Sequence, residues 1–399
     1  MIIGIVALAD YDVVASTVRR VHMLGKGMVA LGHDVHIIIP QRFRPGPLVE
    51  QMDGLTIHWG VTTTPETWSC LAARLHARWA TIRLVDTLAA NCLDWLILYN
   101  LGLEGLSLLM AARRHGARVA VEYCDARMKP KHPRLEDRAR LVWHGLADAL
   151  VPRCSDLNIA ISRFLEQWLR VKAPRAPTLI VPPLVDTDMF RVQPQEAQSF
   201  REKWQLGSKP VIAYLGSYWT VEGVAILLKS VSALVATGEQ FKLVISGAAV
   251  PGYDCDDVPN LVKEMGMDRY VVQTGWLCTE DVIASMSAAD ILVVPKTDDV
   301  ANLAGLATKM AEYLSMGHAV VATHVGDVPL YLHDGVDSLL CSPGVQSELT
   351  NALRRLLNDP AERSRLGINA RQTALNHFDY RSAGRQICAM MRQIQFGSA

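Results

Sequence analysis

Short runs of apolar, mostly β-branched residues alternate with longer helical patterns along nearly the whole chain of 399 residues. In the first half, the runs that predict strands lie at 2–8, 35–39, 95–99, 118–123, 157–161 and 179–181. The segments with a helical pattern lie at 16–30, 103–115, 135–151 and 163–171, and Ser162 is predicted to cap the last of them. Because the strands are apolar throughout, they indicate a parallel sheet with helices on both faces.

The alternation pauses at 182–209, which is rich in Pro, Gln and charged residues, and then restarts. The second series of strands is predicted at 211–215, 241–246, 271–274, 291–294 and 319–321, and Thr279 is predicted to cap a helix between them. Two such series predict an α/β chain of two Rossmann-like, doubly wound parallel-sheet domains that face a central cleft. We place the N-terminal domain at 1–185, a linker at 186–208, the C-terminal domain at 209–378 and a helix that crosses back to the N-terminal domain at 379–399.

The charge balance and the cysteines limit the partners and the compartment. Lys+Arg and Asp+Glu number 40 each, so no overall field would attract nucleic acid, and none is expected as a partner. The eight cysteines are scattered without a CxxC pair, which is typical of reduced thiols and provides no zinc site. The apolar start of the chain lacks a basic flank, and no apolar run approaches the roughly 20 residues of a membrane span. We therefore expect a soluble, cytoplasmic protein.

Two common nucleotide-binding motifs are absent. The loop at 9–16 after the first strand contains no glycine, so the GxGxxG pattern of dinucleotide-dependent dehydrogenases is missing. No GxxxxGK[ST] occurs either, which argues against ATPase chemistry. The fold alone leaves epimerases, phosphorylases and glycosyltransferases open.

The stretch after the strand at 291–294 carries the most informative chemistry. Residues 305–307 are predicted to open a helix that carries Thr308, Lys309 and Glu312. Free backbone N–H groups at a helix start, the positive end of the helix dipole and a lysine together suit phosphate oxygens. Glu312 is placed to accept hydrogen bonds from a ribose diol. A capped amphipathic helix with a solvated Lys and Glu explains the same residues, and this segment alone does not decide between the two.

Stretches spread in order over nearly the whole chain match the motifs of one enzyme family. They are LGHDVHIIIP at 31–40, SDLNIAISRFL at 155–165, VPPLVDTDMF at 181–190, AYLGSYWTVEGV at 213–224, QTGWLCTEDV at 273–282 and TKMAEYLSMGHAVVATHVGDVPLYLHDG at 308–335. In these stretches the sequence resembles the retaining glycosyltransferases of family 4. The resemblance implies the GT-B fold and a hexosyltransferase-type enzyme that uses a nucleoside-diphosphate sugar, retains configuration and needs neither a metal nor a cofactor.

The sequence departs from the family's pattern in the donor site. Where typical members place an Arg and a Lys on the donor diphosphate, this chain has Ser217 and Glu222. Of the two acids that lie eight residues apart in the donor motif, Glu312 matches the second, but Ala304 occupies the first. Asp298 or Asp299 either stands in for the missing acid or lies in a solvated loop. We therefore expect the diphosphate to contact Lys309, the amides of 305–308 and Arg19 or Arg20.

The remaining site residues follow from the same resemblance, with the nucleobase expected near 275–277. The residues predicted to bind the donor are Gly216, Ser217, Gly247, Gly275, Trp276, Leu277, Gly305, Leu306, Ala307, Thr308, Lys309 and Glu312. The residues predicted to be catalytic are Asp125, Lys309 and Glu312, and those predicted to bind the acceptor are Arg19, Tyr123, Cys124 and Arg127. Asp125 follows a strand's carboxyl end, where it can act as a base or contact the sugar, and Glu122 competes for this role. Cys124 is either a polar thiol of the site or, as we favour, a small buried filler.

The sequence says less about the acceptor than about the donor. Arginines among leucines at 71–84 and a basic loop after Asp125 fit an anionic acceptor or a peripheral membrane contact, but a solvated charge run is the favoured interpretation. The leading hypothesis is a retaining glycosyltransferase that acts on a small-molecule, natural-product or cell-envelope glycan acceptor, with a homodimer left open. The alternative is a degenerate, non-catalytic relative that binds a partner. This alternative is supported by the departures from the family's pattern at Ser217, Glu222 and Ala304.

Overall fold

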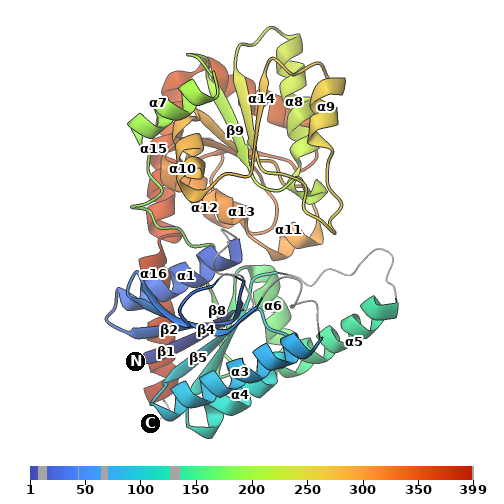
Figure 1. Ribbon diagram of the computed structural model, residues 1–399. Coiled ribbons are helices and arrows are strands. Elements are labelled where there is room, and N and C mark those ends of the chain that lie inside the picture. The colour runs from blue at the N-terminus through green and yellow to red at the C-terminus, as the bar shows by residue number, and fades with distance from the viewer. Residues whose placement is uncertain (8–15, 44, 64–70, 126–134, 398–399) are drawn as a thin grey trace. The chain divides into compact units, whose positions relative to one another are not determined.

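The computed structural model describes residues 1–7, 16–43, 45–63, 71–125 and 135–397. The chain divides into two compact units (Figure 1). Unit 1 consists of Met1–Leu184 together with Tyr380–Ala399, and unit 2 consists of Val185–Asp379. Each unit is an α/β domain built on its own sheet, which confirms the predicted fold class.

The sheet of unit 1 has eight described strands in the order β3-β4-β2-β1-β5-β6-β7-β8. The strands are β1 (Ile2–Ala7), β2 (Asp34–Arg42), β3 (Val49–Met52), β4 (Leu55–Thr62), β5 (Trp95–Tyr99), β6 (Arg118–Tyr123), β7 (Leu157–Ala160) and β8 (Thr178–Ile180). All neighbours pair in parallel except β3, which forms an antiparallel hairpin with β4. Asp53 and Gly54 both have positive φ in the turn of this hairpin, as a tight two-residue turn requires.

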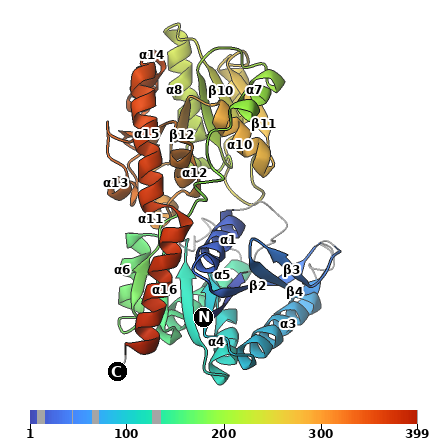
Figure 2. The ribbon, with the colours of Figure 1, turned by 90° about the vertical axis from the view of Figure 1, so that its left-hand side faces the viewer.

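The described helices of unit 1 include one that comes from the end of the chain. They are α1 (Ser16–Val29), α3 (Leu71–Ala90), α4 (Glu104–Arg114), α5 (Leu135–Leu150), the short η1 (Pro152–Cys154), α6 (Arg163–Lys172) and α16 (Tyr380–Phe396). Helix α16 packs along α1 (Figure 2). Gly27 of α1 and Gly384 of α16 lie so close that a Cβ on either would collide with the backbone of the other helix. This contact joins the two ends of the chain in one unit.

The sheet of unit 2 is parallel throughout, in the order β11-β10-β9-β12-β13-β14. Its strands are β9 (Val211–Leu215), β10 (Lys242–Ser246), β11 (Val271–Gly275), β12 (Ile291–Val294), β13 (Ala319–Thr323) and β14 (Leu339–Cys341). Alternate residues of each strand enter two separate hydrophobic clusters, one on each face. The chain moves to one side of β9 for β10 and β11 and to the other side for β12, so the strand order reverses beside β9, where doubly wound sheets bind ligands.

Helices cover both faces of this sheet (Figure 1). They are α7 (Pro194–Lys203), η2 (Thr220–Glu222), α8 (Val224–Ala236), α9 (Val258–Glu264), α10 (Thr279–Ala288), α11 (Val300–Ala304), α12 (Thr308–Met316), α13 (Val328–Tyr331), α14 (Gln346–Asn358) and α15 (Pro360–His377). The stretch predicted as a linker, 186–208, contains α7 and contributes Phe190, Phe200 and Leu206 to the core of unit 2. Its apolar side chains therefore anchor it in this unit.

Of the two predicted helix caps, one is confirmed. The Ser162 hydroxyl accepts a hydrogen bond from the Leu165 amide at 3.3 Å at the start of α6. The prediction for Thr279 is wrong, because Cys278 is the cap residue of α10 and makes no side-chain capping bond. Within the described ranges, none of the helices has the length and apolar character that crossing a membrane requires.

Candidate functional site

Three neighbouring strands of unit 2 end in glycine, and these glycines form one edge of the candidate site. Gly216 follows β9, Gly247 follows β10, and Gly275 ends β11. The Gly216 amide donates to the Ser246 carbonyl at 2.8 Å, and the Gly247 amide donates to the Gly275 carbonyl at 2.9 Å. A Cβ on Gly247 would collide with the Gly216 carbonyl, and a Cβ on Gly216 would collide with the Lys309 ammonium. The bare backbone therefore lets the start of α12 approach the carboxyl end of β9.

Helix α12 begins later than the sequence predicted. Gly305 was expected to open this helix, but its amide donates to the Ala301 carbonyl at 2.9 Å and so closes α11. The helix starts at Thr308, with Ala307 as the cap residue and no side-chain cap. Within the described part of the chain, the amides of Thr308 and Lys309 have no backbone acceptor. The N–H groups suited to an anion thus belong to the first turn of α12 rather than to Gly305.

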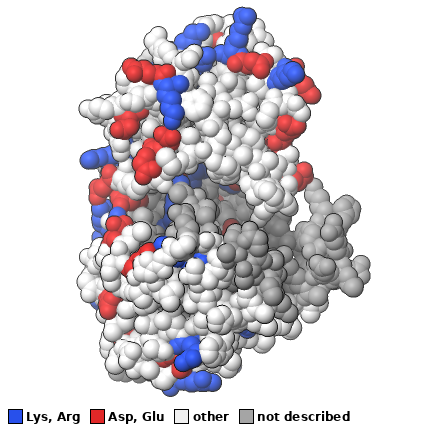
Figure 3. Space-filling view, viewed as in Figure 1, with Lys and Arg blue, Asp and Glu red and all other residues white. Residues whose placement is uncertain are grey.

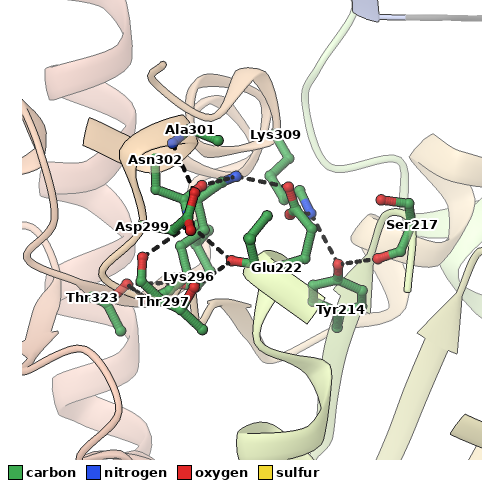
Figure 4. A network of polar contacts seen from close by, with 12 residues as sticks. Tyr214, Ser217, Glu222, Lys296, Thr297, Asp299, Ala301, Asn302, Lys309 and Thr323 are labelled. Atoms are coloured by element: carbon green, nitrogen blue, oxygen red, sulfur yellow. Dashed lines mark hydrogen bonds and ion pairs between the residues drawn. The ribbon is translucent and has the colours of Figure 1, made fainter. Parts of the chain in front are cut away.

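Lys309 lies in this first turn with its ammonium group held by two side chains (Figure 4). Its Nζ is 2.6 Å from Glu222 Oε2 and 3.2 Å from the Tyr214 hydroxyl oxygen. The same Nζ lies 4.4 Å from the centre of the Tyr214 ring, within cation–π range. Lys309 is therefore a largely buried, ion-paired side chain rather than the solvated lysine of the alternative interpretation.

Glu222 joins Lys309 to a second lysine (Figure 4). Its other oxygen, Oε1, lies 2.7 Å from Lys296 Nζ, and that ammonium also donates to Asn302 Oδ1 at 2.8 Å. Asn302 in turn donates to the Val221 carbonyl at 2.8 Å. We call Glu222, Lys296 and Lys309 the lysine–glutamate cluster. Two cations share one carboxylate in it, so the cluster has a formal charge of one positive unit.

The cluster is largely shielded from solvent, which perturbs the protonation of its members. The exposed fractions of the Glu222, Lys296 and Lys309 side chains are 12%, 14% and 15%. Burial opposes ionisation of Glu222, but the two ammonium groups outweigh it and lower the pKa of this carboxyl to about 2. Burial lowers the pKa of Lys309, although the charge of Glu222 opposes the shift. Glu222 therefore stays ionised at any physiological pH, and Lys309 loses its proton more readily than an exposed lysine.

The rest of the predicted donor stretch surrounds this cluster. Glu312 lies in the second turn of α12 and is buried. Tyr313 next to it accepts a hydrogen bond from the Leu215 amide at 2.8 Å, which ties α12 to the end of β9. Leu306 is buried in the core, whereas Ala307 and Thr308 are half-buried. The structure thus brings Gly216, Gly247, Thr308, Lys309 and Glu312 together at the carboxyl ends of β9 and β10.

The residues after β11 differ from each other in exposure. Trp276 is 64% exposed directly after Gly275, whereas Leu277 packs against the hydrophobic core. An exposed indole beside a strand's carboxyl end offers a flat surface on which a ring can stack. Trp276 is therefore available to a ligand, and Leu277 offers only its backbone.

The positions where the sequence departs from the family's pattern have specific structural roles. The Ser217 carbonyl accepts the Tyr214 hydroxyl at 2.7 Å, so Ser217 orients the tyrosine that contacts Lys309. Ala304 is fully buried in α11. Asp299 caps α11 through its Oδ1, which accepts the Ala301 amide at 2.8 Å, and Asp298 is exposed. Asp299 thus has a capping role that competes with the expected role as a substitute acid.

In unit 1, the predicted residues near the end of β6 are mostly buried. Tyr123 packs edge-on against the Trp168 ring, with the ring centres 5.5 Å apart, and Cys124 is buried, with its pKa raised well above the ordinary value by burial. Asp125 is exposed directly after them. Arg127 lies outside the described residues. Cys124 therefore matches the favoured interpretation as a buried filler.

The two arginines of α1 have different environments. Arg20 is buried, and its Nε donates to Glu122 Oε1 at 2.8 Å. Its other two nitrogens donate to the carbonyls of Val181 and Pro182, both at 2.8 Å. Arg20 and Glu122 are therefore buried and paired with each other, which favours a structural role for both over the phosphate-binding and base roles considered from the sequence. Arg19 is half-buried on the same helix.

Sequence reasoning missed three residues of the site, namely Tyr214, Lys296 and Asn302. Tyr214 belongs to an apolar strand, where its hydroxyl gave no signal. Lys296 follows Pro295 at the end of β12, and a charged residue at the carboxyl end of a parallel strand is a usable signal. No group of three or more His, Cys, Asp or Glu side chains that could hold a metal ion occurs in the described ranges.

The sequence matches two family descriptions, one in each unit. Residues 17–183 match the "Glycosyl transferase 4-like domain", and residues 209–359 match "Glycosyl transferases group 1". The sucrose-phosphate synthase structure from Thermosynechococcus elongatus covers 100% of both chains with a TM-score of 0.77 at 18% identity. The chain belongs to the GT-B glycosyltransferases. Anabaena HepE in complex with UDP shares the fold as well, with a TM-score of 0.73 at 18% identity over 98% of this chain and 100% of that one.

Curated relatives of this chain match over part of their length. The alpha-D-kanosaminyltransferase of Streptomyces kanamyceticus is 26% identical over 52% of this chain and 52% of its own. The 2-deoxystreptamine glucosyltransferase of the same organism is 29% identical over 46% of each chain. The GDP-mannose-dependent alpha-(1-6)-phosphatidylinositol monomannoside mannosyltransferase of Mycolicibacterium smegmatis is 25% identical over 59% of this chain and 62% of its own. The chain thus spans about half the length of the curated relatives that it matches.

Proposed function

We propose that this protein is a retaining glycosyltransferase that takes a hexosyl-type sugar from a nucleoside diphosphate. The observation that carries the proposal is the lysine–glutamate cluster in unit 2. There, Lys309 lies in the uncapped first turn of α12 and within 2.6 Å of Glu222, beside the point where the strand order reverses. A positive helix end with a buried cation is suited to the charge that develops on a departing diphosphate.

The chemistry of the site follows from this placement. As the bond between the sugar and the diphosphate breaks, negative charge grows on the phosphate oxygens. Lys309 and the amides of Thr308 and Lys309 stabilise that charge in a shielded site, where such interactions are stronger than in water. We propose that Glu312 accepts the ribose hydroxyls and that Trp276 stacks on the nucleobase. Because lysine and helix amides supply the positive charge, we propose a reaction that requires no metal.

The acceptor proposal rests on the relatives. The names of the two matched proteins of Streptomyces kanamyceticus describe transfer of kanosamine and transfer to 2-deoxystreptamine, and a third describes transfer to a phosphatidylinositol mannoside. We propose a small-molecule, natural-product or cell-envelope glycan acceptor for this chain. Asp125, exposed at the end of β6, is the residue that we propose to contact the acceptor or the sugar.

Nucleotide binding tests the proposal directly. The intact protein is mixed with UDP-, GDP- and ADP-sugars, and the unfolding temperature and the release of free sugar are measured. At a donor concentration of about 100 times Kd, binding stabilises by about 2.7 kcal/mol, or about 5–10 °C for a unit of this size. Lys309→Ala and Glu312→Ala should each reduce that shift. Lys203→Ala, which removes an exposed lysine paired with Asp281 on the surface of unit 2, should leave it unchanged.

The outcome also separates the two hypotheses. If none of these nucleotides shifts the unfolding temperature or loses its sugar, the transferase proposal fails, and the non-catalytic, partner-binding relative becomes the better explanation. Donor binding that persists in both Lys309→Ala and Glu312→Ala would instead place the donor elsewhere.

A further inference from the structure

Lys296 is the member of the lysine–glutamate cluster that none of the matched motifs explains. We propose that Lys296 is a positioning residue for donor binding, since it neutralises Glu222 in part and so keeps the Lys309 cation available to the diphosphate. The inference rests on the proposed function, because it concerns the same donor site.

The bond pattern divides the Glu222 carboxylate between the two lysines. Oε1 accepts from Lys296 and Oε2 accepts from Lys309, so neither ammonium has the carboxylate to itself. Lys309 carries three N–H donors. Glu222 and the Tyr214 hydroxyl account for two of them within the described ranges, which leaves the third for an incoming anion. Without Lys296, both carboxylate oxygens would be free to turn to Lys309.

Lys296 is fixed by the backbone around it, not only by its ion pair. Its carbonyl accepts the Thr323 hydroxyl at 2.7 Å, and its ammonium donates to Asn302. The neighbouring Thr297 amide donates to the Val221 carbonyl at 3.1 Å, which fastens the loop after β12 to the turn that carries Glu222. These contacts hold the lysine in place without a ligand, as a positioning residue requires.

Charge decides what the arrangement offers to an anion. With both lysines the cluster carries one net positive charge, whereas Glu222 and Lys309 alone would form a neutral pair. All three side chains are at most 15% exposed, so water and salt screen their fields only weakly. A diphosphate with two or more negative charges should bind far better to the charged cluster than to the neutral pair. This explains how a site with glutamate at position 222 can still bind a diphosphate.

The test varies the net charge in both directions. Lys296→Met leaves a formal charge of zero, Glu222→Gln leaves two positive charges, and the double variant Lys296→Met/Glu222→Gln restores one. UDP, GDP and ADP are titrated calorimetrically into each intact variant, and unfolding temperatures are measured in parallel. Lys296→Arg serves as the conservative variant that keeps the charge.

We expect Lys296→Met to weaken binding of the preferred nucleoside diphosphate by about 10- to 100-fold. The affinity of Lys296→Arg should stay within about 5-fold of that of the unchanged protein. Glu222→Gln should bind the nucleotide at least as tightly as the unchanged protein does. The decisive variant is the double one, which should regain most of the affinity lost in Lys296→Met even though it has lost further contacts.

A merely structural role for Lys296 predicts a different ranking of the variants by nucleotide affinity. Affinity would then follow the unfolding temperature, and the double variant, with both ion pairs removed, would bind most weakly; that result would overturn the inference. Unchanged binding by Lys296→Met would overturn it as well. If the unsubstituted protein binds none of the three nucleotides, the proposed function itself fails, so the two failures remain distinguishable. Should Lys296→Met not fold, the comparison of Glu222→Gln with the double variant still reports the effect of Lys296.

Discussion

Replacement of Arg20 by methionine should destabilise unit 1 severely. Arg20 is buried and forms an ion pair with Glu122, with its NH2 atom 2.6 Å from Glu122 Oε1. The second carboxylate oxygen of Glu122 is buried and has no hydrogen-bond partner within the described residues. Without Arg20, the carboxylate would therefore lose its partner while remaining shielded from water.

The size of the effect follows from these contacts. Removing one member of a buried ion pair typically costs about 3–5 kcal/mol, because the remaining charge is left uncompensated. The carbonyls of Val181 and Pro182 would also lose their donors. For a unit of about 200 residues, the loss corresponds to a fall of roughly 6–20 °C in the unfolding temperature.

The loss of stability can be measured by thermal and urea unfolding of Arg20→Met, Glu122→Met and the double variant. The double variant should be more stable than Arg20→Met alone, since an apolar pair of similar volume replaces the isolated charge. Nucleotide binding is measured on the same samples at a temperature where they are folded. A loss below about 1 kcal/mol in Arg20→Met, together with clearly weaker donor binding, would refute the structural role and return Arg20 to the phosphate site.

Three further outcomes follow from the contacts of particular residues. Gly384→Ala should lower the stability of unit 1 by about 1–3 kcal/mol, because its Cβ would collide with the Gly27 backbone. Gly145→Ala, with open space around it, should be neutral or stabilising. Thermal unfolding compares the two variants. Gly216→Ala should weaken donor binding at least 10-fold by calorimetry, since its Cβ forces the Lys309 ammonium away, and unchanged affinity would contradict this geometry. Donor affinity should be full while Lys309 is protonated and should fall as pH rises through its lowered pKa, with a midpoint below the ordinary lysine pKa of 10.5. Lys309→Arg should remove this transition. A midpoint at or above pH 10.5 would refute the role of the buried Lys309 as the cation that binds the donor.

The buried strands could be predicted from the sequence because burial on both faces demands continuous apolar runs. The predicted strands at 95–99, 118–123, 211–215 and 291–294 agree with β5, β6, β9 and β12 residue for residue. The hairpin of β3 and β4 escaped prediction, because Val49–Met52 is mostly exposed and has no apolar run. The Asp53–Gly54 pair was the available signal, since such a pair favours a two-residue hairpin turn.

The candidate site was predictable only in part, for a different physical reason. Lys309 and Glu312 stand one turn apart on one helix, so a linear motif carries both of them. The partners of Glu222 lie 74 and 87 residues away in sequence, and the partner of Arg20 lies 102 residues away. Sequence patterns report which face of a helix or strand a residue occupies, but an ion pair between distant elements depends on how these elements pack.

Glu222 shows why a departure from a motif cannot be judged one position at a time. In the sequence it appears as the loss of a cation from the phosphate site. In unit 2 it is the shared partner of Lys296 and Lys309, which come from the loop after β12 and from the start of α12. The cluster as a whole remains positive. On the face that Figure 3 shows, the Lys and Arg side chains of unit 2 are interspersed with Asp and Glu. What an anion would meet at this site is therefore set by the charges of several side chains together in space, not by position 222 alone.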